Sequence, residues 1–163
     1  MKKFELTNEF IANRFGTKLF RIRALVEFGD VEAGELGGYV EKESNLGHDD
    51  NAWVYGNAWV YGDAQVSGDA RVCGDARVCG NGDYAYAHGF GSVNRTTTFF
   101  RLKDGGVGVR CGCFYGTLAK FRDKIRETHG ETKKAQEYLM LADLMELRFE
   151  EDENEVGNRK YVE

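Results

Sequence analysis

The clearest pattern of apolar and polar positions lies in residues 51–80, where five consecutive six-residue units share one motif. The units read NAWVYG, NAWVYG, DAQVSG, DARVCG and DARVCG. In each unit the alanine and the valine lie two positions apart, so a strand places both side chains on one face. The glycine that ends each unit is followed by Asn or Asp, and these residue types tolerate positive φ. Each unit is therefore predicted to form a short strand, with inward Ala and Val, and a corner.

A strand this short buries little by itself, so the units are expected to stack as in a solenoid. The run resembles the hexapeptide-repeat proteins. That resemblance implies a left-handed parallel β-helix with three hexapeptides per coil, in which residue i stacks under residue i+18. Val54 is then expected under Val72. The same register predicts stacks of Val60 under Val78, Leu36 below Val54, Val40 below Ala58, and Leu46 below Ala64. The predicted fold class is mainly β, with a short left-handed β-helix at 36–83.

The outward positions of the run carry aromatic, basic and cysteine side chains. The same register sets Trp53 beside Arg71, and Trp59 beside Arg77, within reach of cation–π contacts. Clustered exposed aromatic groups are typical of interaction surfaces. We expect them to form either a ligand site or the subunit contacts of a homotrimer, which the family resemblance implies. The residues of this predicted surface are Trp53, Tyr55, Trp59, Tyr61, Arg71 and Arg77.

The two ends of the chain are predicted to cap the coils. Residues 1–35 contain strand-like segments at 4–6 and 20–25, with a turn at 13–16, and indicate a β-hairpin cap. Residues 84–149 indicate an α+β cap, with a connector at 84–92 and a hairpin of strands 96–102 and 107–114. Two helices are predicted to follow, the first capped by Thr117 and the second by Thr132. Residues 150–163 indicate an acidic, disordered tail.

Composition sharpens this picture. The 163 residues include 21 glycines and no proline, which agrees with many tight corners and excludes collagen-like or polyproline segments. The net charge is −5, yet residues 84–134 hold 10 basic and 4 acidic residues, a local charge of +6. That segment is suited to an anionic partner, although an ordinary solvated face is the simpler alternative. The candidates for anion contacts are Arg95, Arg101, Arg110, Lys120 and Arg122.

The four cysteines are expected to be reduced thiols. No long apolar run and no secretory signal are present, so we expect a cytoplasmic protein without a membrane span. Cys73 and Cys79 are expected on different faces of the coil, too far apart for a disulfide. Cys111 and Cys113 would need His129 or His88 to complete a zinc site, so no metal or cofactor is predicted.

A second resemblance spans nearly the whole chain. It is carried by the segments FRIRAL from Phe20, FGDV from Phe28, LGGYVE from Leu36, the NAWVYG run and CGCFYG from Cys111. The arrangement resembles small proteins of bacteriophages and prophages. That resemblance implies an accessory protein that blunts host defence, either by clamping a host protein or by sequestering a nucleotide signal.

The predicted function is therefore a non-catalytic, homo-oligomeric protein that binds an anionic small molecule or a host defence protein. One alternative is an acyltransferase that uses acetyl-CoA, which the hexapeptide resemblance also implies, with His88 as the best-placed base rather than His48 or His129. Few regular coils, and no loop interrupting residues 51–80, argue against it. A structural oligomer is the second alternative. Duplex nucleic acid is disfavoured by the acidic total and the lack of a recognition motif.

Overall fold

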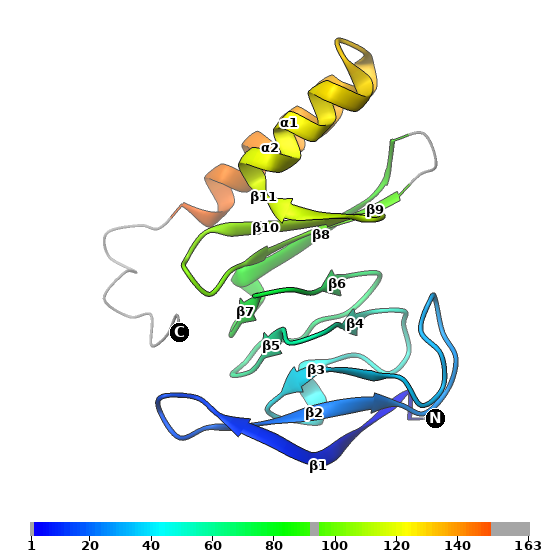
Figure 1. Cartoon of the computed structure of the whole chain (residues 1–163), viewed down its shortest axis with the longest axis vertical. Coiled ribbons are helices and arrows are strands. Elements are labelled where there is room, and N and C mark those ends of the chain that lie inside the picture. The colour runs from blue at the N-terminus through cyan, green and yellow to red at the C-terminus, as the bar shows by residue number, and fades with distance from the viewer. Residues whose placement is uncertain (1, 92–94, 151–163) are drawn as a thin grey trace.

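The computed structural model describes residues 2–91 and 95–150, and its elements stack along one long axis (Figure 1). The N-terminal strands lie at one end, the repeat segment (residues 51–80) lies in the middle, and a sheet covered by two helices lies at the other end. In chain order the elements are β1 (Phe4–Ala12), β2 (Lys18–Ala24), β3 (Leu36–Val40), η1 (Glu43–Asn45), β4 (Trp53–Val54), β5 (Trp59–Val60), β6 (Arg71–Val72), β7 (Arg77–Val78), η2 (Asn81–Asp83), β8 (Tyr84–Phe90), β9 (Arg95–Arg101), β10 (Val107–Cys111), β11 (Phe114–Thr117), α1 (Leu118–His129) and α2 (Lys133–Phe149).

The predicted fold class, a left-handed parallel β-helix, is wrong for this chain. The described strands form three separate sheets: a mixed sheet in the order β1-β2-β3-β5-β7, a parallel pair β4-β6, and an antiparallel sheet in the order β11-β10-β9-β8. Among the described residues, parallel pairing occurs between β3 and the two-residue strands of the repeat segment, within that segment, and at the single bridge between Leu46 and Val66. Strands β1 and β2 are joined by a short turn, as are β9 and β10, and both pairs are antiparallel.

Within the repeat segment, the predicted 18-residue register between each unit and the third unit after it is confirmed. Val54 pairs with Val72, and Val60 pairs with Val78, each in parallel. The alanine and valine of all five units are buried, as the alternation predicts. Gly56, like the last residues of the next three units, has positive φ and forms the predicted corner.

The register predicted before the repeat is wrong. Val40 pairs with Val60, and Leu46 bridges to Val66, so the offset is 20 residues instead of 18. Seven positions separate Leu46 from Trp53 along the chain, whereas five separate Val66 from Arg71. The two extra residues lie in the turn around His48 and shift every earlier position. Leu36 is consequently half exposed and pairs with β2 instead of entering the core.

The N-terminal hairpin is confirmed, because β1 pairs antiparallel with β2. Asn13 shapes the predicted turn: its side-chain oxygen accepts hydrogen bonds from the backbone N–H groups of Phe15 and Thr17. Strand β2 also pairs with β3, so the hairpin continues the mixed sheet. The packed residues of this sheet and the inward Ala and Val of the repeat form one core.

The C-terminal sheet contains two strands, β8 and β11, that were not predicted from the sequence, since the strand predicted over 107–114 ends at Cys111 and β11 begins at Phe114. The hairpin of β9 and β10 is confirmed, but the predicted connector forms strand β8, which pairs along β9. Alternation of Tyr84, Ala85 and Tyr86 is a strand pattern that the glycines after it obscured. Phe99 packs with the helices and Phe100 with the repeat core, so this sheet is buried on both faces.

Both predicted helices are confirmed with their caps. Thr117 accepts a hydrogen bond from the backbone N–H of Lys120 and begins α1, and Gly130 ends it at positive φ. Thr132 accepts from Ala135 N–H in the same way and begins α2. The predicted acidic tail lies outside the described residues from position 151 onward.

Candidate ligand-binding pocket

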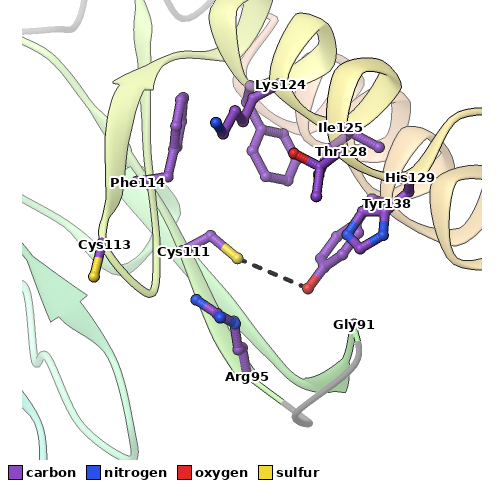
Figure 2. A pocket seen from close by; sticks show the side chains of 11 residues that line it. Gly91, Arg95, Cys111, Cys113, Phe114, Lys124, Ile125, Thr128, His129 and Tyr138 are labelled. Carbon is purple, nitrogen blue, oxygen red and sulfur yellow. Dashed lines mark hydrogen bonds between the residues drawn. The ribbon is translucent and has the colours of Figure 1, made fainter.

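The antiparallel sheet and the two helices border a pocket of about 230 Å³ (Figure 2). Strands β9 and β10 and the turn after β10 supply one side, and α1 and α2 supply the other. The lining residues are Gly91, Arg95, Cys111, Cys113, Phe114, Phe121, Lys124, Ile125, Thr128, His129 and Tyr138.

Local sequence determines which side chains reach the pocket. The cap at Thr117 sets the start of α1, after which Phe121, Lys124 and Thr128 follow at helical spacing on the side of the sheet. On the strand side, Cys111 ends β10 with its thiol directed into the pocket, whereas Cys113 points away from it (Figure 2). Helix packing and strand alternation together bring these residues to one place.

Aromatic rings form much of the helix side of the pocket. Phe121 and Tyr138 meet edge to face, with ring centroids 5.7 Å apart. Phe114 lies 5.8 Å from Phe121, and His129 stacks on Tyr138 at 5.9 Å. Rings held against one another in this way form a rigid, largely apolar wall.

The charged side chains that line the pocket are basic. Arg95 extends from the start of β9 on one side, and Lys124 extends from α1 on the other (Figure 2). The Arg95 guanidinium lies so close to Gly112 that a Cβ at that position would collide with it. No Asp or Glu lines the pocket, and no described carboxylate forms a salt bridge with Arg95 or Lys124. The lining therefore favours a negatively charged occupant.

A chain of hydrogen bonds lies at the base of the pocket. The Thr97 hydroxyl donates to the Cys111 sulfur at 3.2 Å, and the Cys111 thiol donates to the Tyr138 hydroxyl oxygen at 3.8 Å. Burial raises the pKa of Tyr138 well above its usual value, and the neighbouring Cys111 raises it further. The Tyr138 hydroxyl therefore keeps its proton at neutral pH.

Two other surface hollows are larger but differ in charge. One, of about 510 Å³, is lined by Glu5 and Glu9 of β1, with Arg23 of β2 as its one basic residue. The other, of about 560 Å³, is lined by Asp104, Glu146 and Glu150 near the end of α2. Carboxylates in both linings disfavour an anion, so the pocket with Arg95 is the better candidate despite its smaller volume.

The predicted surface role of Trp53 is wrong, because its ring is fully buried. It packs against Phe4 and Phe28, with ring centroids 6.4 and 5.3 Å away. A Cβ at Gly37 would lie 2.7 Å from this ring, so strand β3 covers it closely. The N-terminal hairpin and β3 therefore cover the side of the repeat that carries Trp53, which was expected to be exposed.

Trp59 and Arg77 form the predicted cation–π pair, with the guanidinium carbon 3.8 Å from the ring centroid. Tyr61 is buried and packs in a small cluster with Leu19 and Tyr39. Tyr61 is therefore packed within the chain, whereas Trp59 and Arg77 are partly exposed. They do not reach the pocket beside Arg95.

Tyr55 and Arg71 converge on one carboxylate on another side of the repeat. Asp30 accepts hydrogen bonds from the Tyr55 hydroxyl at 2.8 Å and from Arg71 at 3.1 Å. The Arg110 guanidinium lies over the Tyr55 ring at 4.2 Å. Burial alone would raise the pKa of Asp30, but the Tyr55 hydrogen bond and the two arginines hold it below its usual value. This cluster joins the N-terminal loop, the repeat and the C-terminal sheet.

The other predicted anion contacts do not meet in the pocket. Arg101 is buried, and its guanidinium donates to the backbone carbonyl of Phe149 at 3.0 Å. Arg122 forms an ion pair with Asp143 at 2.8 Å on α2. Lys120 is exposed on α1 and is not a lining residue. Of the five basic candidates, only Arg95 lines the pocket.

The three histidines lie in three different places. His88 is exposed on β8, where its Nδ1 lies 2.7 Å from the Thr96 hydroxyl, and it does not line the pocket. His48 stacks on Phe4 at 4.3 Å and accepts a hydrogen bond from the backbone N–H of Lys3. His129 is the histidine among the lining residues.

Sequence reasoning missed most of this pocket. Phe121, Lys124 and Tyr138 line the pocket but are not among the site residues predicted from the sequence. A signal was present in the helical spacing of positions 121, 124, 125 and 128, which combines apolar and basic side chains on one side of α1. Which strand would face that side could not be read from the chain.

The cysteines carry no sign of a metal site. All four are free thiols, as predicted, and no group of three or more His, Cys, Asp or Glu side chains suited to a metal occurs among the described residues.

None of the described helices is long and apolar enough to cross a membrane. No protein-family model and no curated protein sequence matches the chain.

Proposed function

We propose that this protein binds a small anionic molecule with a flat ring, such as a nucleotide, in the pocket between Arg95 and Lys124. The carrying observation is the combination of two cations and an aromatic wall, without an acidic lining residue. Arginine binds phosphate oxygens in a bidentate geometry, and aromatic rings stack on bases of any sequence.

The proposed arrangement gives each group one task. Arg95 and Lys124 contact the phosphate from two sides, and the ring of the ligand lies along Phe114 and His129. The protonated Tyr138 hydroxyl is a donor at the base of the pocket. A volume of about 230 Å³ lies below the ~300–1,000 Å³ of drug-sized sites. Part of a nucleotide would therefore remain in solvent.

The proposed consequence of binding is sequestration. A protein that holds a nucleotide lowers its free concentration without chemical change, and this effect scales with the number of protein copies. Sequestration of a signalling nucleotide would suit the accessory role implied by the resemblance to small phage proteins.

Calorimetric titration tests this function. The panel contains nucleoside monophosphates, cyclic nucleotides and the matched nucleosides without phosphate. Arg95→Gln and Lys124→Gln remove one cation each, whereas Lys120→Gln removes a cation of the same helix that does not line the pocket. We expect nucleotide binding by the wild type and by Lys120→Gln, and at least ~10-fold weaker binding by the pocket variants, since a charge-assisted hydrogen bond contributes about 1.5–3 kcal/mol. Absence of nucleotide binding, or equal binding by all variants, would contradict the proposal.

A further inference from the structure

The side chains that line the pocket beside Arg95 donate hydrogen bonds more readily than they accept them. Arg95 and Lys124 are donors only, because guanidinium and ammonium groups carry no acceptor atom. The Thr128 hydroxyl and the His129 ring, both on the last turn of α1, can each act as donor or acceptor. Among the described lining residues there is no Asp, Glu, Asn or Gln. A ligand is therefore recognised mainly through its own acceptor atoms.

Tyr138 offers a hydroxyl proton at the base of the pocket. The residue is 2% exposed, and its hydroxyl lies beside the Cys111 thiol on the strand side of the pocket (Figure 2). The Thr97 hydroxyl donates to the Cys111 sulfur at 3.2 Å, and the Cys111 thiol donates to the Tyr138 oxygen at 3.8 Å. Among the described residues, no hydrogen bond has the Tyr138 hydroxyl as its donor. Its proton is therefore available to a ligand.

The Tyr138 hydroxyl keeps this proton although a cation acts on it. Burial raises the pKa of Tyr138, and Cys111 raises it further, whereas the positive charge of Arg95 lowers it. The upward shift prevails, so the hydroxyl is a donor at neutral pH. The part of a ligand that reaches the base of the pocket meets two donors, Tyr138 and Arg95, and no carboxylate or amide side chain of a described residue.

Purine bases differ in what one edge presents to such donors. Guanine and hypoxanthine carry two adjacent acceptors, the carbonyl oxygen O6 and the ring nitrogen N7. Adenine carries N7 beside the N6 amine, which is a donor. An edge with two acceptors takes the Tyr138 proton without bringing another donor to the base of the pocket. Adenine would bring its amine there, and an amine without an acceptor loses the hydrogen bonds that it makes in water.

We infer that the pocket selects a nucleotide with a 6-oxopurine base, and that Tyr138 is the residue that determines this choice. The Tyr138 hydroxyl donates to O6 or N7 of the base, while Arg95 and Lys124 hold the phosphate. Selection against adenine comes from its unpaired amine as much as from the hydrogen bond that the 6-oxopurine gains. This inference rests on the proposed nucleotide site and narrows its ligand to one class of base.

Calorimetric titration of the full chain with inosine monophosphate and adenosine monophosphate tests the selectivity. The two nucleotides share the sugar and the phosphate, and they differ in whether position 6 of the purine carries a carbonyl or an amine. We expect the wild type to bind inosine monophosphate at least ~10-fold more tightly, because a donor left unpaired in a buried site is costly.

A matched pair of variants assigns the selectivity to one hydroxyl. Tyr138→Phe keeps the ring that packs against Phe121 and removes the hydroxyl. We expect its affinity for inosine monophosphate to fall by ~10-fold, toward the affinity for adenosine monophosphate, which stays unchanged. A purely structural loss would weaken both nucleotides alike. Tyr86→Phe removes an exposed hydroxyl outside the pocket and should keep the wild-type ratio. Circular dichroism checks that both variants are folded.

The outcomes separate this inference from the proposed function. Equal binding of the two nucleotides by the wild type, or tighter binding of adenosine monophosphate, overturns the inference and leaves the nucleotide site standing. A preference for inosine monophosphate that Tyr138→Phe retains overturns the role of Tyr138. Absence of binding by either nucleotide overturns the proposed function, and the choice of base with it.

Discussion

The hydroxyl oxygen of Tyr138, on α2, lies 3.8 Å from the thiol sulfur of Cys111, at the end of β10. This contact joins the helical layer to the sheet at the base of the pocket (Figure 2). Burial first, and then the neighbouring Cys111, raises the pKa of Tyr138. Deprotonation of this hydroxyl would put a charge in a packed site, so the folded state holds the proton more tightly than the unfolded chain does.

The first prediction concerns alkaline pH. A pKa raised in the folded state contributes stability below the unfolded value, near pH ~10 for tyrosine, and that stability is lost as pH rises above it. Tyr138→Phe should therefore show a smaller fall in the free energy of unfolding between neutral and strongly alkaline pH. Urea denaturation at a series of pH values measures this fall in the free energy of unfolding. Tyr86→Phe, at an exposed side chain, should keep the wild-type fall, and the same fall in Tyr138→Phe would contradict the assignment.

The second prediction concerns the close approach of β3 to the repeat. A Cβ at Gly37 would lie 2.6 Å from the carbonyl oxygen of Val54, and one at Gly38 would lie 2.6 Å from that of Ala58. Gly37→Ala and Gly38→Ala should each lower the free energy of unfolding by about 1–3 kcal/mol. Gly82→Ala meets nothing within 4 Å and is the control. Thermal melts measure the effect, and equal melting temperatures for all three variants would show that β3 does not pack this tightly against the repeat.

The third prediction concerns Trp59 and Arg77, whose cation–π contact spans 3.8 Å. A double-mutant cycle with Trp59→Leu and Arg77→Gln should give a coupling energy of about 0.5–2 kcal/mol in favour of the pair. Trp53 and Arg71 occupy the corresponding register positions but form no such contact, because Trp53 is core. Urea titrations of the four proteins measure the cycle, and a coupling near zero would mean that the stacked geometry contributes nothing.

The fourth prediction concerns helix α1, which carries Phe121 and Lys124 into the pocket. Thr117→Ala removes the cap hydrogen bond and should cost about 1 kcal/mol. The first turn of α1 leads directly to the pocket residues. Loss of the cap should therefore lower ligand affinity as well as stability. Thr117→Ser keeps the cap and should restore both properties. If Thr117→Ala weakens neither stability nor binding, the cap does not set the position of α1.

A structural feature can be predicted from this sequence when residues close together in the chain determine it. It cannot be predicted in this way when distant segments determine it. The 18-residue pairing of Val54 with Val72 follows from repeated units, and the caps at Thr117 and Thr132 follow from local chemistry. The fold class did not follow, because sheet order depends on how distant strands meet. Two extra residues in the turn around His48 were enough to shift the register of β3.

The pocket shows the same difference between what local residues determine and what distant segments determine. Arg95 was singled out by its charge within a basic segment, but nothing local distinguished it from Arg101, which is buried against the backbone of Phe149. Two residues of the pocket, Cys111 and Tyr138, lie 27 positions apart and meet only after the sheet and α2 have packed. A single sequence does not encode that distance in any local pattern.

A crystal structure of the wild-type protein with the tightest-binding nucleotide of the panel tests the central claim most directly. We predict that a phosphate oxygen lies within hydrogen-bond distance of both Arg95 and Lys124, and that the base lies against Phe114 or His129. A nucleotide seated elsewhere on the chain would contradict the account. So would a pocket that stays empty at saturating nucleotide concentration.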